Sequence, residues 1–364
     1  MLAERVDRVR RRMAAEGVDV LLVSLGADLP YLTGYEAMPL ERLTMLVLPV
    51  DGDATLVVPR LEAPRVEERP DVFTLRPWEE TEDPVAIVAA LAGRPSTAAI
   101  GDRTWARFVL DLQQRLPGTA WRRASDITGP LRAVKGPDEV AALRRAAEAA
   151  DRVAAALRAG DIPLVGRTEA DVSAELGRRL VEEGHARVNF AVVGSGPNAA
   201  SPHHEPGERV IERGEVVLCD FGGTTPDGYC SDITRCVHVG EPPAEVVQLY
   251  AVLQEAQAAA VAAAVVGTPC EAVDAAARRR IAAAGLGDRF LHRTGHGIGL
   301  EEHEDPYLVE GNTEPLVAGH AFSVEPGIYL PGRTGLRLED IVVATDAGPE
   351  PLNQADHDLA VVEG

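Results

Sequence analysis

Lysine is almost absent from this chain, since Lys135 is its only lysine and the remaining basic residues are arginines. Basic side chains number 36 and acidic ones 57, which gives a net charge of −21. No basic block interrupts this acidic balance, and an acidic surface repels phosphate backbones. The composition therefore predicts a protein that does not bind nucleic acid.

Long apolar runs are also missing. The longest uncharged run in an apolar context, Ala256–Cys270, is rich in alanine and is too short and too weakly apolar to cross a membrane. Residues 1–17 carry charges throughout and lack the apolar core of a secretory signal. We expect a cytoplasmic protein that contacts no membrane.

Cysteine is scarce, with four residues and no spacing typical of a zinc site. A disulfide scaffold is therefore excluded, and we expect reduced, buried cysteines. The 364 residues, 46% of them hydrophobic, have ordinary globular composition. At about 150 residues per domain, this length predicts about two domains.

The first domain is expected over residues 1–128, where helical and extended patterns alternate. An amphipathic helix is predicted over 4–16 and an apolar strand over 17–25, while Asp51-Gly52 favours a hairpin between 42–49 and 54–59. Further strands are expected near 72–75, 98–100 and 120–122, and further helices near 83–92 and 104–115. This pattern is typical of a small α/β domain.

The second domain is expected over residues 129–364, and its pattern occurs twice. Pro137 is well placed in the first turn of a long helix. Two helices (138–158 and 168–183) precede strands near 188–193, 215–221 and 229–238, and two more helices (243–265 and 270–283) precede strands near 320–330 and 336–343. This order predicts an α+β domain with a curved antiparallel sheet covered by two helix pairs.

Two hairpins are predicted to present pairs of carboxylates. Asp220 ends one apolar run and Asp232 lies in the next strand, with Pro226 at the midpoint of a turn sequence. Glu325 and Glu339 have the same relation around Gly332. We therefore expect each pair to face across its hairpin, with Cβ atoms about 5 Å apart.

Four carboxylates this close repel one another unless protons or cations neutralise them. Between the hairpins, the segment HRTGHGIGLEEHE holds His292, His296 and His303, with glycines that permit close backbone approach around the middle histidine. One imidazole with four carboxylates suits Mn²⁺, Co²⁺ or Fe²⁺ better than a structural zinc site. A water bridging two such ions would be deprotonated near neutral pH and would act as a nucleophile.

The order of the motifs DFGG, SDITR, GHGIGLEEHE, SVEPG and RLED resembles that of the pita-bread metallopeptidases, in the branch of Xaa-Pro aminopeptidases and Xaa-Pro dipeptidases. The resemblance covers about residues 131–360, and the preceding domain resembles the creatinase-type amino-terminal domain. It implies a pita-bread α+β catalytic domain with a smaller α/β domain, and a homodimer.

The resemblance also implies the site residues. Two divalent ions, Mn or Co first and Zn or Fe as alternatives, would be held by Asp220, Asp232, His296, Glu325 and Glu339. Asp232 and Glu339 would bridge the ions, and Glu325 would shuttle a proton.

Further side chains follow from the same resemblance. His203 and His303 would bind substrate and move protons, and His292 would line the proline pocket. His204 follows His203 in an extended segment, so only one of the two should face the site, and we expect His203. Arg337 shares a strand face with Glu339 and would orient a carboxylate or steady His303.

The expected substrates are small peptides with proline in second position. Some dipeptidase relatives carry an arginine shortly after the HExP motif, but Tyr307 stands there in this chain. Arg337 or a partner subunit would then have to hold a substrate carboxylate, so aminopeptidase and dipeptidase specificity both stay open. A metal-free creatinase-like amidinohydrolase and a non-catalytic binding protein on the same scaffold are the alternative functions.

Overall fold

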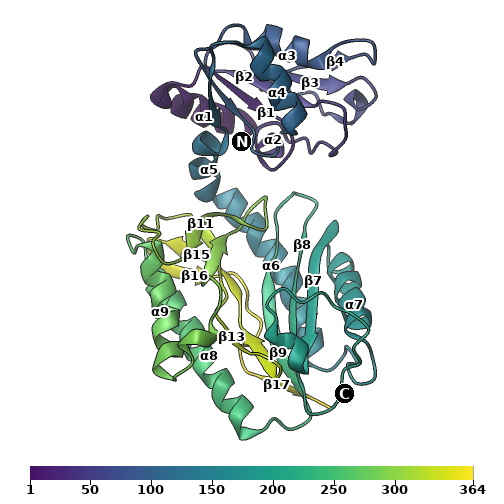
Figure 1. The fold of residues 1–364 in the computed structure, drawn as a ribbon, viewed down its shortest axis with the longest axis vertical. Coiled ribbons are helices and arrows are strands. Elements are labelled where there is room, and N and C mark those ends of the chain that lie inside the picture. Colours follow the sequence, from purple (N-terminus) through teal and green to yellow (C-terminus); the bar gives the residue numbers. More distant parts are fainter. Residues whose placement is uncertain (364) are drawn as a thin grey trace. The chain divides into compact units, whose positions relative to one another are not determined.

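The computed structural model describes residues 1–363 and forms two compact units, Met1–Arg132 and a second unit that begins at Ala133 (Figure 1). The domain limits inferred from composition, 1–128 and 129–364, stay a prediction. Each unit has its own apolar core.

The first unit is built on a mixed six-stranded sheet in the order β4-β3-β2-β1-β5-β6. The predicted hairpin is confirmed, because Met45 pairs with Val57 and Gly52 adopts a positive φ of 99° at the turn. Helices α2 and α5 were not predicted. The elements are α1 (Leu2–Glu16), β1 (Val20–Val23), α2 (Asp28–Thr33), β2 (Met45–Pro49), β3 (Thr55–Pro59), β4 (Thr74–Trp78), α3 (Pro84–Ala92), β5 (Thr97–Ile100), α4 (Ala106–Arg115), β6 (Ala120–Arg123) and α5 (Ser125–Ala133).

The second unit repeats two helices followed by strands, as the sequence pattern predicts. Its first half comprises α6 (Pro137–Arg158), α7 (Glu169–Glu182), β7 (Arg187–Ser195), β8 (Val216–Thr224) and β9 (Ile233–Val239). Its second half comprises α8 (Ala244–Ala263), α9 (Cys270–Ala283), β10 (Gly295–Gly297), β11 (Glu304–Leu308), β12 (Ala321–Val324), β13 (Gly327–Leu330), β14 (Thr334–Arg337), β15 (Asp340–Thr345), β16 (Gly348–Pro351) and β17 (Ala360–Val362).

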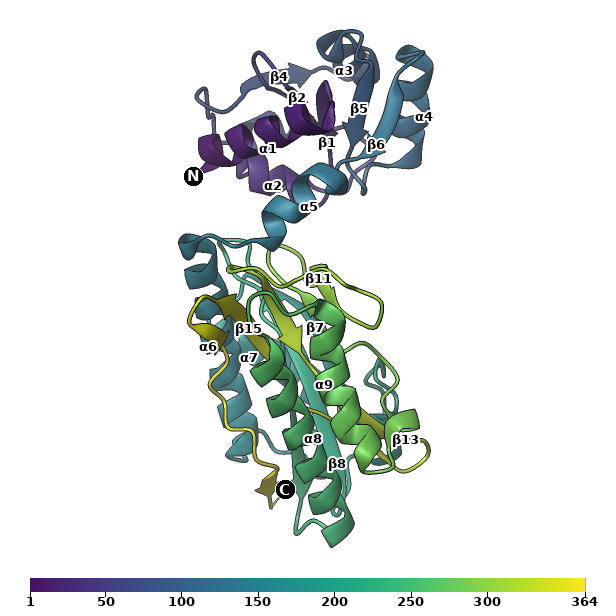
Figure 2. The same ribbon diagram turned by 90° about the vertical axis from the view of Figure 1, so that its left-hand side faces the viewer.

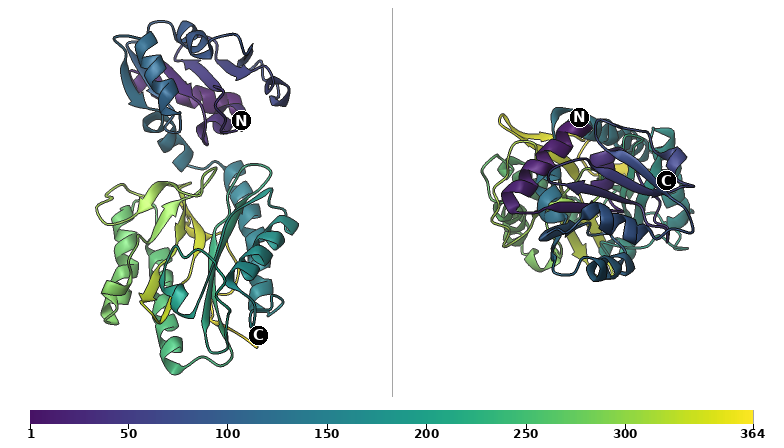
Figure 3. Two further views of the ribbon diagram at one scale, coloured as in Figure 1. Left: turned by 45° about the vertical axis from the view of Figure 1, so that its right-hand side comes forward. Right: turned by 90° about the horizontal axis from the view of Figure 1, so that it is seen from above.

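The strands of this unit lie between the two helix pairs. Figures 1 and 3 show α6 and α7 on one side of the strands and α8 and α9 on the other. Within the strand layer, one sheet has the order β17-β9-β8-β7, a second has the order β11-β10-β12-β15-β16, and β13 pairs with β14. An isolated bridge between Thr234 and Glu339 joins the halves at the centre.

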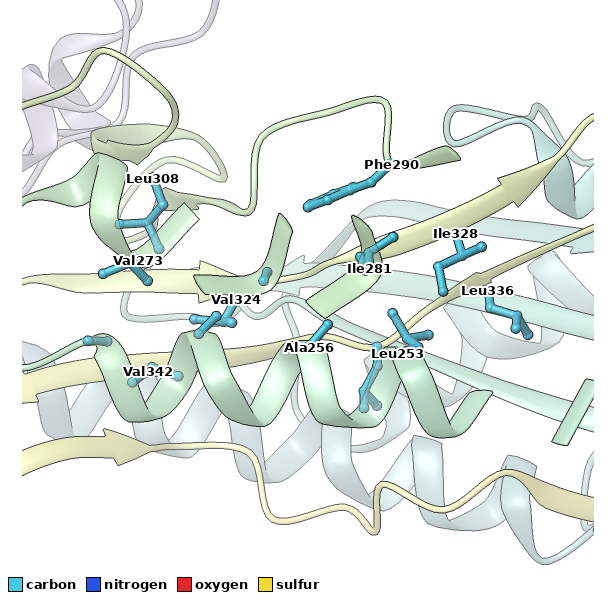
Figure 4. Close-up of a cluster of buried hydrophobic side chains, with 14 of the residues drawn as sticks. Leu253, Ala256, Val273, Ile281, Phe290, Leu308, Val324, Ile328, Leu336 and Val342 are labelled. Carbon is cyan, nitrogen blue, oxygen red and sulfur yellow. The ribbon is translucent and has the colours of Figure 1, made fainter. Parts of the chain in front are cut away.

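Helix α8 packs into the largest core of the unit. By length and composition alone this helix, with a mean hydropathy of 1.2, is long and apolar enough to cross a membrane, so the expectation that the protein contacts no membrane stays a prediction. Figure 2 shows α9 beside α8. The buried Leu253 and Ala256 of α8 gather with Val273 and Ile281 of α9 and with strand side chains (Figure 4). Its alanine-rich part thus packs against the strands, where Ala256 and Ala260 share a core with Val324 and Ile328.

Candidate active site

The first acidic pair lies on one face of the β8–β9 hairpin. Asp220 pairs with Thr234, and Asp232 lies two positions before Thr234, so the two carboxylates are diagonal neighbours. The prediction that they stand directly opposite each other is therefore wrong. The turn centre is one residue further along than predicted, because Gly228 adds a left-handed residue (φ 90°) to the turn at Pro226.

The second acidic pair follows the predicted register. Val324 pairs with Asp340 and Gly327 pairs with Arg337, so the strands on both sides of Glu325 and Glu339 are centred on Gly332, as expected. The hydroxyl of Thr234 donates a hydrogen bond of 2.6 Å to Glu339 Oε2. This bond and the Thr234–Glu339 bridge bring the two hairpins together.

His296 lies between the hairpins on β10. Its Nε2 atom is 3.3 Å from Glu325 Oε1 and 3.6 Å from Asp232 Oδ2, and its side chain is buried. Thus the imidazole contacts one carboxylate from each hairpin.

The glycines beside His296 are required by the close approach of neighbouring strands. A Cβ atom on Gly295 would lie 1.8 Å from the carbonyl oxygen of Ser323, and one on Gly297 would lie 2.2 Å from the carbonyl oxygen of Asp305. The expectation drawn from the glycine-rich motif is confirmed, and these contacts fix His296 over the acidic cluster.

Burial and charge repulsion dominate the electrostatics of the cluster. Burial, reinforced by the neighbouring carboxylates, raises the pKa of Asp232 and of Glu339 well above their ordinary values, and it raises the pKa of Glu325 to about 7. Burial, with the nearby His303, lowers the pKa of His296 to about 3. The imidazole is therefore neutral, and the carboxylates need protons or cations.

The donor set fits a divalent metal. Asp232, His296 and Glu339 each offer one ligand atom, and these atoms lie within 4.8 Å of one another. Asp220 Oδ1 is buried without a hydrogen-bond partner, while Asp220 Oδ2 is held by Arg337. A neutral imidazole, acidic oxygens and an unpartnered carboxylate oxygen are the ligands such ions bind.

Histidines border the cluster. The ring centroid of His303 lies 4.1 Å from that of His296, and the charge of His203 helps to lower the pKa values of both His292 and His303. His204 instead forms a 2.7 Å contact with Glu169 through its Nε2 atom. The expectation that His203 faces the site stays a prediction, as do the catalytic roles of His203 and His303.

Arg337 and His292 are joined by Tyr329, which the sequence analysis did not single out. Arg337 donates to the Tyr329 hydroxyl at 3.0 Å and to Thr234 Oγ1 at 3.1 Å. His292 Nε2 lies 2.7 Å from the same hydroxyl, and its Nδ1 lies 2.7 Å from the carbonyl oxygen of Arg293. Because a carbonyl only accepts, Nδ1 carries the proton and Nε2 accepts from Tyr329. The sequence feature that could have indicated Tyr329 is its position in β13, the strand that follows Glu325.

Comparison with known proteins assigns the chain to a family. Residues 141–346 match the model of metallopeptidase family M24, and residues 5–134 match that of the creatinase/prolidase N-terminal domain. The chain belongs to metallopeptidase family M24. The predicted pita-bread fold with a creatinase-type amino-terminal domain is therefore confirmed, as is the prediction of a metallopeptidase, and membership implies a divalent metal.

Relatives share nearly the whole length of this metallopeptidase. It is 45% identical to the probable dipeptidase PepE of Mycobacterium tuberculosis, covering 99% of this chain and 96% of that one. It is 34% identical to the Xaa-Pro dipeptidase of Lactobacillus helveticus, covering 98% of each. Among solved structures, the prolidase of Thermococcus sibiricus superposes with a TM-score of 0.94 at 36% identity, covering 100% of this chain and 99% of that one.

Proposed function

We propose that this metallopeptidase is a dipeptidase that hydrolyses the peptide bond before proline in Xaa-Pro dipeptides, with two Mn²⁺ or Co²⁺ ions bound. The observation that carries the proposal is the convergence of carboxylates from two hairpins on the neutral imidazole of His296. The relatives named dipeptidase, Xaa-Pro dipeptidase and prolidase support the substrate class.

The proposed metal ligands are the five residues predicted from the sequence. Asp232 and Glu339, the two most deeply buried carboxylates of the set, would bridge the ions. Bound divalent ions would supply an acidified water and a polarised scissile carbonyl. The ligands are Asp220, Asp232, His296, Glu325 and Glu339.

The remaining chemistry belongs to side chains of the chain. Glu325 would take a proton at Oε1 from the attacking water and return it to the proline nitrogen that leaves. Ser323 donates to that oxygen at 3.2 Å and steadies it. His203 and His303 would hydrogen-bond the peptide oxygens. Arg337 holds the carboxylate of Asp220 in place.

The test is hydrolysis of a dipeptide Xaa-Pro and a tripeptide Xaa-Pro-Yaa by protein stripped with chelator and then reloaded with Mn²⁺ or Co²⁺. We expect metal-dependent cleavage of the dipeptide. The variant Glu339→Gln should lose both bound metal and activity, whereas Glu245→Gln, which changes an exposed carboxylate, should lose neither.

Cleavage of the tripeptide in preference to the dipeptide would replace the dipeptidase proposal with aminopeptidase activity. Protein that binds no metal and cleaves neither peptide would overturn the peptidase proposal. A homodimer belongs to the same proposal and rests on family resemblance alone; sedimentation of the metal-loaded protein at the mass of one chain would refute it.

A further inference from the structure

One cation beside the acidic cluster, Arg293, has no acidic partner within the part of the chain that the structure describes. Arg293 lies between His292 and the start of β10, and pairing of Gly295 with Leu308 places it beside Tyr307. Its guanidinium carbon is 4.5 Å from the centroid of the Tyr307 ring. Within residues 1–363, no side chain or carbonyl forms a hydrogen bond or an ion pair with this guanidinium, which is only partly buried.

The charge of Arg293 acts on the reacting groups. It lowers the pKa values of His303 and His296 and opposes the increase in the pKa of Glu325. Together with its contact with Tyr307 on the strand that follows His303, this places a positive charge at the edge of the space where the peptide must lie.

The other cations of this region are already occupied. Arg337 donates to Asp220, Thr234 and Tyr329, and also to the carbonyl oxygen of Pro202. These donors are used by groups of the protein, and the prediction that Arg337 orients a substrate carboxylate or steadies His303 stays a prediction.

Two further basic groups are likewise engaged. Lys135 pairs with Glu304 at 2.6 Å, and Arg278 pairs with Asp274 at 2.6 Å. Both nitrogens of His292 also have partners within the protein. Among the basic groups near the cluster in residues 1–363, Arg293 therefore remains with donors that no protein group uses.

We propose that Arg293 binds the terminal carboxylate of the substrate and thereby selects dipeptides over longer peptides. A guanidinium presents paired N–H donors that match a carboxylate, and stacking on Tyr307 orients its plane while leaving the donors at its edge free. Some dipeptidase relatives carry an arginine where this chain has Tyr307. Arg293, from the segment before β10, thus supplies the guanidinium that is missing at that place. This inference rests on the proposed Xaa-Pro dipeptidase function.

The experiment compares an Xaa-Pro dipeptide with its carboxyl-terminal amide, because the two substrates differ mainly in the terminal charge. Arg293→Gln should lower kcat/KM for the dipeptide about 10- to 100-fold more than it lowers kcat/KM for the amide, because a charge-assisted hydrogen bond to the terminal carboxylate is lost only with the dipeptide, whereas the electrostatic effect on His303 and Glu325 is common to both substrates. Arg293→Lys should restore part of the preference. The control Arg289→Gln removes the same charge from an exposed arginine and should change neither substrate.

A binding measurement separates substrate contact from a structural role. Free proline should inhibit the wild-type enzyme more strongly than prolinamide, and Arg293→Gln should remove that difference while metal content stays unchanged. Equal losses on dipeptide and amide, or no loss on either, would overturn the assignment of Arg293. If the metal-loaded wild-type enzyme cleaves neither substrate, the proposed function fails, which is a result distinct from failure of the Arg293 assignment.

Discussion

The sole lysine supports the strand that begins directly after a predicted catalytic histidine. Lys135 Nζ lies 2.6 Å from Glu304 Oε1, and the two side chains are 1% and 8% exposed. Glu304 is the first residue of β11 and follows His303 directly. The ion pair therefore anchors the start of β11 beside His303, which borders the acidic cluster, and Lys135→Met should weaken both stability and kcat.

The size of the effect follows from the burial of Glu304. Removing one partner of a buried ion pair costs about 3–5 kcal/mol, because the remaining charge lies in a poorly solvated place. The Glu304 carboxylate can lose its charge by taking up a proton. Protonation costs about 1.4 kcal/mol for each pH unit above the ordinary glutamate pKa of about 4.3. That route limits the loss to about 3.7 kcal/mol at pH 7 and to about 1 kcal/mol at pH 5.

Urea unfolding at pH 5, 6 and 7 measures the difference between wild type and Lys135→Met. We expect the loss of stability to increase with pH, because the protonated carboxyl is the form that the altered site accepts. The double variant Lys135→Met with Glu304→Gln has no charge at either of these two positions, so it should recover most of the stability at pH 7. A loss that is equal at pH 5 and pH 7 would refute this reasoning.

Three further predictions concern the cluster and its supports. Loading the metal-free protein with Mn²⁺ should release more protons at pH 6 than at pH 8, because Glu325, with a pKa of about 7, still holds a proton at the lower pH. Calorimetry in buffers of different ionisation enthalpy measures the number of protons released, and equal release at both pH values would contradict the prediction. Gly297→Ala should lose bound metal on dialysis, because the added Cβ would collide with the carbonyl oxygen of Asp305, whereas Gly207→Ala, whose Cβ has open space, should keep its metal. Full retention of metal by Gly297→Ala would show that the strands can separate at little cost. Glu169→Gln should lower kcat/KM about tenfold by loosening the segment that carries His203, with metal content unchanged; wild-type kinetics would refute that positioning role.

Local rules were enough to predict the second acidic hairpin. Alternation of side chains and the turn chemistry around Gly332 depend on neighbouring residues, so the register of Glu325 and Glu339 could be predicted from sequence. The first hairpin shows the limit of that approach. One left-handed glycine, Gly228, moved the turn centre by a residue and made Asp220 and Asp232 diagonal neighbours.

The sequence alone therefore determined the fold class, the family and the residue types of the metal cluster, because motifs and periodicities are short-range properties. Only the tertiary structure decided which groups contact one another over long separations. It paired Lys135 with Glu304, engaged Arg337 with Asp220 and, among the residues that the structure describes, left Arg293 without an acidic partner. These contacts depend on how strands from both halves of the catalytic unit pack, and no local pattern encodes that packing.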